Sequence, residues 1–148
     1  MVLLGLDAGL DGGWNTKVRG TAVSRVGDVV VVAVPDPVAR LVVVRAAYAT
    51  ALLELAAAAG EGLLVSEHKV SKNSPSKLAA DITIDGGRLE FSPARLRSTW
   101  LVAHLEAGTQ LPVLLRAAGM RTFGSLGDLL GFVRPLADDK ARTELAGA

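Results

Sequence analysis

Arginine and lysine side chains gather in the middle of this 148-residue chain, and clustered cations can bind the phosphates of a nucleic acid. Between residues 69 and 121 lie eight basic residues, Lys69, Lys72, Lys77, Arg88, Arg95, Arg97, Arg116 and Arg121, against four acidic ones, Asp81, Asp85, Glu90 and Glu106. The whole chain carries a net charge of only +1, which is low for a nucleic-acid-binding domain. A solvated charged surface without a ligand is the alternative reading of this stretch.

Two of these arginines, Arg95 and Arg97, fall in the first turns of an expected helix. Ser92 is a favourable N-cap, and Pro93 suits the first helical position because its missing N–H is not needed there. We expect this helix to run to about Glu106. Its start would hold the two guanidinium groups where they could reach a phosphate or a carboxylate from another segment.

The segment from Ser92 to Phe132 resembles the end of the catalytic domain of tyrosine recombinases, the phage integrase family. In that family a T-x-H-x-L-R-H-T-F box opens a helix, and a G-H element and the nucleophilic Tyr follow. Arg97 stands at the Arg of the box, whereas Ala94 replaces its first His. Met120 replaces the His of the G-H element, and Phe132 stands at the Tyr.

Two further family elements are altered in the same way. The text A-G-L-D-G-G-W, Ala8–Trp14, matches the family's T-G-L-R-x-x-E turn, so that Asp11 replaces an Arg. The expected hairpin turn, residues 34–40, lacks the family Lys. A covalent route needs a nucleophile and fixed cations, and the one Tyr, Tyr48, lies far from the expected position. The resemblance therefore implies a degenerate domain, not an enzyme, with one of the six catalytic positions kept.

Asp11 and Arg97 are expected to face one pocket if the family geometry holds. They would then form a buried or half-buried salt bridge that fills the former phosphate site. The alternative is that Arg97 still binds phosphate. We favour the salt bridge because a carboxylate at that position repels an anion.

The order of elements predicts an α+β fold with a small antiparallel sheet packed on a mostly helical domain. Apolar spacing and breaker residues indicate the end of a helix up to Leu10, then a hairpin or small meander up to Arg45. Further expected elements are a helix over 46–59 ended by Gly60, a short strand over 62–65, and helices over 75–84, 93–106 and 111–118. A last helix is expected from Ser125, ended by Pro135, before a weakly helical tail.

Composition predicts one domain over residues 1–148, with a core over about 4–133 and a tail over 134–148 that could act as a docking helix. No cysteine is present and no spacing of His, Asp and Glu suggests a metal or another cofactor; His104 is expected to stack on Trp100. No apolar run reaches the ~20 residues that span a bilayer, and we expect a cytoplasmic protein. The apolar start without a capping residue suggests a piece cut from a longer protein.

Three functional hypotheses follow from these residues. The first is a catalytically inactive recombinase-like domain that binds duplex DNA, or supports a DNA-associated assembly, through phosphate contacts of Lys69, Lys72, Lys77, Arg95 and Arg97. The second is a protein–protein interaction module that keeps the fold without DNA, with a homo-oligomer or another protein docking through the C-terminal tail. An active integrase with an unusual nucleophile ranks last.

Overall fold

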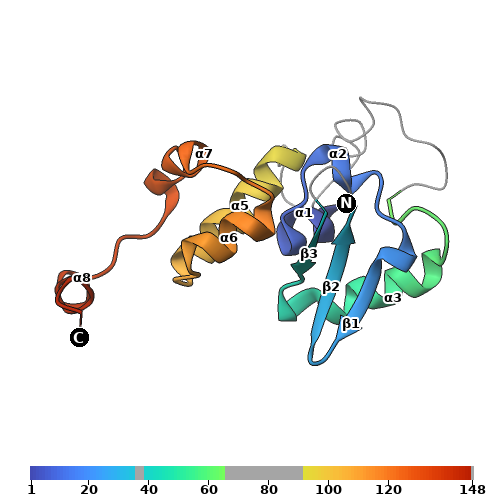
Figure 1. Ribbon diagram of the computed structural model, residues 1–148, viewed down its shortest axis with the longest axis horizontal. Coiled ribbons are helices and arrows are strands. Elements are labelled where there is room, and N and C mark those ends of the chain that lie inside the picture. Colours follow the sequence, from blue (N-terminus) through green and yellow to red (C-terminus); the bar gives the residue numbers. More distant parts are fainter. Residues whose placement is uncertain (36–38, 66–91, 148) are drawn as a thin grey trace, which may run out of the picture.

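The computed structural model describes residues 1–35, 39–65 and 92–147. Its first part comprises α1 (Val2–Ala8), α2 (Gly12–Asn15), the 3-10 turn η1 (Gly20–Ala22), β1 (Val23–Val26), β2 (Val29–Val34), β3 (Arg40–Val43), η2 (Ala46–Tyr48) and α3 (Ala49–Ala59). Its second part comprises α5 (Pro93–Glu106), α6 (Leu111–Ala118), α7 (Gly124–Gly127), η3 (Leu130–Phe132) and α8 (Asp138–Leu145). Figure 1 shows α5 and α6 beside α1, with the chain running on through α7 to an outlying α8.

The three strands form one antiparallel sheet in the order β1–β2–β3, which confirms the predicted meander and α+β class. Val32 in the central strand pairs with Val23 on one side and Val42 on the other. Runs of valine favour this structure because β-branched side chains fit a pleated surface. The two strands β1 and β2 are joined by a two-residue turn in which Gly27 adopts a φ of 57°.

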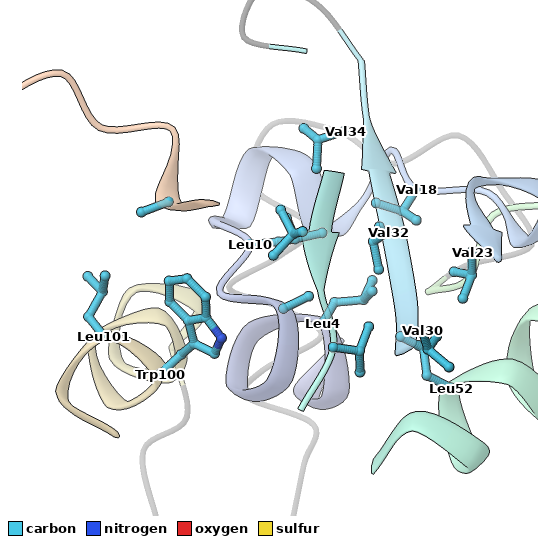
Figure 2. Close-up of a cluster of buried hydrophobic side chains, with 14 of the residues drawn as sticks. Leu4, Leu10, Val18, Val23, Val30, Val32, Val34, Leu52, Trp100 and Leu101 are labelled. Carbon is cyan, nitrogen blue, oxygen red and sulfur yellow. The ribbon is translucent and has the colours of Figure 1, made fainter. Parts of the chain in front are cut away.

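One face of the sheet builds the core. Val30, Val32 and Val34 point toward Leu4, Leu10 and Leu52, as Figure 2 shows. Successive residues of a strand point to opposite faces, so the unbroken valine run also supplies apolar side chains to the other face. By the strand register that outer face consists of Ser24, Val26, Val29, Val31, Ala33, Leu41 and Val43, and it carries no charge.

Helices α1 and α5 approach closely because glycines face α5. A Cβ on Gly5 would lie 2.7 Å from Cβ of Leu96, and a Cβ on Gly9 would lie 2.3 Å from the Trp100 ring. Gly9 also takes a φ of 57°, the left-handed conformation that ends α1. The helix expected up to Leu10 therefore ends two residues earlier, at Ala8, and the indole of Trp100 is fully buried against Gly9.

Several boundaries agree with the sequence and others do not. The helix over 93–106, its Ser92 cap, and the helices ending before Gly60 and Gly119 are confirmed. Residues 62–65 do not form a strand, because only Leu63 makes a β-bridge, with Arg19. The expected helix from Ser125 is wrong too: α7 begins at Gly124 and is followed by η3. Glycines at 124, 127 and 131 disfavour a continuous helix there. The helix expected over 75–84 lies outside the described residues.

Candidate nucleic-acid interface

Arg97 lies in the second turn of α5, in the position that the Ser92 cap gives it. The Oγ of Ser92 accepts the N–H of Arg95 at 3.2 Å, which fixes the start of the helix. The half-buried guanidinium of Arg97 donates from Nη1 to the main-chain oxygen of Gly9 and from Nη2 to that of Ala118 at 2.6 Å. Arg97 therefore joins two segments that are distant in sequence.

Both acceptors lie at helix C-termini, where main-chain carbonyls lack partners within the helix. Gly9 ends α1, and Ala118 is the last residue of α6 before the left-handed Gly119. Arg40, at the start of β3, donates from Nε to the oxygen of Ala117 at 2.9 Å. Two cations thus meet at the C-terminal end of α6, where the helix dipole favours positive charge.

Asp11 has a different role from the expected salt bridge. Its exposed carboxylate accepts the N–H groups of Gly13 at 2.9 Å and Trp14 at 3.1 Å, so it caps α2. Within the residues that the structure describes, it makes no ion pair with Arg97, and that expectation is wrong. Arg97 reaches helix-end carbonyls instead, while the backbone N–H groups of α2 already engage Asp11.

The charges of the cluster still influence one another. Burial lowers the pKa of both Arg40 and Arg97, and the nearby Asp11 carboxylate opposes this by raising each. Arg40 further lowers the pKa of Arg97, as expected for two cations close together. Asp11 and Arg97 are therefore close enough to interact electrostatically, although they form no ion pair in the described residues.

The other predicted positions are scattered. Ala94 and Arg95 are exposed at the start of α5, and Met120 is half-buried just after α6. Phe132 in η3 is 73% exposed, and Tyr48 in η2 is 42% exposed. Three predicted DNA contacts, Lys69, Lys72 and Lys77, lie outside the described residues.

Arg40 is the site residue that the sequence argument missed. The sequence places Arg40 only at the end of the expected hairpin turn, residues 34–40, and not among the candidate ligands. Its pairing with Val34 puts it on the inward face of the sheet, beside the end of α6. A cation at an inward position of an otherwise apolar strand was the signal that could have identified it.

The crystal structure of XerA recombinase matches 98% of this chain with a TM-score of 0.66 and 14% sequence identity. This chain has a tyrosine-recombinase-like fold. It spans about half of the XerA chain, 53% of its length. No family model matches the chain, and no curated protein does.

The described residues offer few other kinds of site. They contain no group of three or more His, Cys, Asp or Glu residues placed to hold a metal ion. Among the helices described, none has the length and apolar character needed to cross a membrane. A groove of about 470 Å³ lies between β3 and the α5–α6 pair, with Leu41, Val43 and Val113 among its walls and Arg40 and Arg116 also lining it.

Proposed function

We propose that this chain is a catalytically inactive domain of the tyrosine-recombinase fold that binds the backbone of duplex DNA. The observation that supports it is the convergence of Arg40 and Arg97 at the C-terminal end of α6. Guanidinium groups bind phosphate well, because their planar array of N–H donors matches the spacing of its oxygens. Such contacts would position the domain on DNA without reading the base sequence.

Inactivity follows from the side chains at the positions that match the family's catalytic set. Phe132 has no oxygen with which to attack a phosphodiester, and Asp11 places a negative charge where the family has an Arg. The expected nucleophile is thus absent, and an anion stands in the place of a stabilising cation. Transition-state stabilisation in phosphoryl transfer is largely electrostatic, so both changes oppose catalysis.

The geometry of Arg97 suits the binding of an intact DNA phosphate without catalysis. A guanidinium has five N–H donors, and the two hydrogen bonds to Gly9 and Ala118 hold it in a fixed orientation with donors remaining. Two cations and one carboxylate leave the cluster with a net positive charge. The lysines at 69, 72 and 77, which lie outside the described residues, and the exposed Arg95 remain candidates for further contacts with the DNA backbone.

Binding is tested by fluorescence anisotropy with a labelled generic duplex. We expect Arg97→Gln and Arg40→Gln to weaken binding by about tenfold each, the effect of one charged contact. Arg25→Gln, which removes an exposed arginine of β1, is the matched control and should change binding little. Equal affinities in all four proteins would remove the cluster from the interface.

Inactivity is tested separately with a nicked suicide duplex, which traps a covalent recombinase intermediate. We expect no protein-linked DNA on a denaturing gel. A covalent band would contradict the inactive assignment even if the binding experiment succeeded.

A second candidate function is protein–protein interaction, favoured by exposed apolar side chains. On the outer face of the sheet Val26, Leu41 and Val43 are roughly half exposed, and the last two also line the groove beside β3. In the C-terminal segment α8 has no buried residue. Apolar surface of this kind often marks an interface, and the tail could dock on a partner or on a second copy.

This alternative is tested by the oligomeric state. Sedimentation velocity across a range of concentrations should reveal self-association that Leu41→Ser reduces if the outer face is used. The same experiment on Leu145→Ser examines the tail. A monomer at every concentration would leave only a different protein as partner.

A further inference from the structure

Asp7, on α1, has the most unusual environment of the described acidic residues. It is 1% exposed, and neither of its carboxylate oxygens has a hydrogen-bond partner within the described residues. Buried carboxylates are nearly always paired, because an isolated charge in apolar surroundings is costly. The neutral acid is therefore the form that this environment accommodates best.

Charged groups from each neighbouring element surround the end of α1. Arg97 and His104 lie on α5, and Asp11 caps α2. Arg45 follows β3, and its main-chain N–H donates to the main-chain oxygen of Asp7 at 3.1 Å. The chain's own amino group lies at the opposite end of α1. Only Arg45 among them acts on the Asp7 carboxyl. Burial outweighs that cation and raises the pKa of Asp7 to about 6.

The same helix end carries two contacts to α5. Gly9, two residues after Asp7, packs directly against the Trp100 ring, and its carbonyl accepts a hydrogen bond from Arg97. A movement of this end of α1 would therefore change the surroundings of Trp100. Trp100 is thus a natural reporter of what happens at Asp7.

We propose that the protonated Asp7 carboxyl holds the C-terminal end of α1 in place, and that its ionisation releases this helix end. With the carboxyl protonated, the end of α1 stays seated on the turn between β3 and η2. When the carboxyl ionises, it must reach water or Arg45, and the helix end loosens from that turn and from Trp100. The C-terminal end of α1 is therefore held at acidic pH and less tightly packed at neutral pH.

The test is the emission of Trp100 in the folded protein as a function of pH. A Trp14→Phe background leaves Trp100 as the single tryptophan. We expect a native-state transition with a midpoint near pH 6, the pKa of Asp7. Asp7→Asn in that background should abolish it, because the amide keeps the size of the side chain but cannot ionise.

Two further variants keep the test decisive if Asp7→Asn folds poorly. Arg45→Gln removes the one cation that acts on Asp7, so the midpoint should move to higher pH. Burial and Arg45 lower the pKa of His104 from its ordinary value, and His104→Gln should leave the transition in place. No transition, a transition that survives Asp7→Asn, or one that disappears with His104→Gln would each overturn the proposal.

Discussion

Two regions contain similar numbers of apolar residues but differ in how far they bury them. One is the junction of α1 with α5, and the other is the C-terminal segment from Met120 to Gly147. At the junction, glycines bring the helices together and Trp100 is 1% exposed. In the C-terminal segment Leu126 is buried, whereas Phe123, Phe132 and Leu145 are 57%, 73% and 89% exposed. The first region holds this domain together. The second has apolar side chains that only a further contact could cover.

The largest effect should come from removing the side chain at the centre of the junction. Trp100→Ala is expected to destabilise the fold by roughly 3–5 kcal/mol, through lost burial and the cavity beside Gly9. Urea unfolding gives the value. Trp14→Ala is the control, because Trp14 is only half-buried and should cost much less. Equal costs for the two would mean that the junction does not hold the fold.

Asp7 should make the junction region sensitive to pH. Its folded pKa of about 6 lies above the value of ~3.9 for an unfolded Asp. Between these values the folded state binds more protons, so the unfolding free energy falls as pH rises and levels off above about pH 6. Asp7→Asn should remove that slope and raise stability at pH 7 by up to about 3 kcal/mol. A slope unchanged in the variant would contradict this.

Arg97 should have a smaller effect on stability, and one that depends only weakly on Asp11, because the two side chains form no ion pair. Arg97→Gln loses the charged hydrogen bonds to two helix ends and should cost about 2 kcal/mol. Asp11→Asn keeps a capping oxygen and should cost a few tenths of a kcal/mol. The double variant should be additive within about 0.5 kcal/mol. A coupling of several kcal/mol would instead indicate a salt bridge between Asp11 and Arg97, which the structure does not contain among its described residues.

The smallest effect is expected in the C-terminal segment. Phe132→Ala should change the unfolding free energy by about 0.5 kcal/mol or less, because exposed positions contribute little. Thermal unfolding of the dilute protein is the measurement. A cost near that of Trp100→Ala would show that this segment is packed in solution, and the contrast between the two regions would fail.

The sequence predicted the fold better than it predicted the site. Valine runs, the Ser92 cap and the stop glycines Gly9, Gly60 and Gly119 are local signals, and they placed most elements correctly. The partner of Arg97 was not a local matter. The partner depended on which helix ends lie close together in the fold. Every residue has a main-chain carbonyl, so the sequence does not show which of them Arg97 contacts. Arg40 did carry one local signal, a cation within an apolar strand, but its partner at the end of α6 could not be predicted from the sequence.

The central claim, that the Arg40–Arg97 cluster contacts DNA phosphates, is tested most directly by the salt dependence of duplex binding. Each phosphate contact contributes about −0.9 to the slope of log affinity against log salt concentration. The wild-type chain should show a slope equivalent to a few contacts, and Arg97→Gln should reduce it by about one contact across unrelated DNA sequences. Arg25→Gln should leave it unchanged. A chain that does not bind at low salt, or a slope that Arg97→Gln does not alter, would contradict the account.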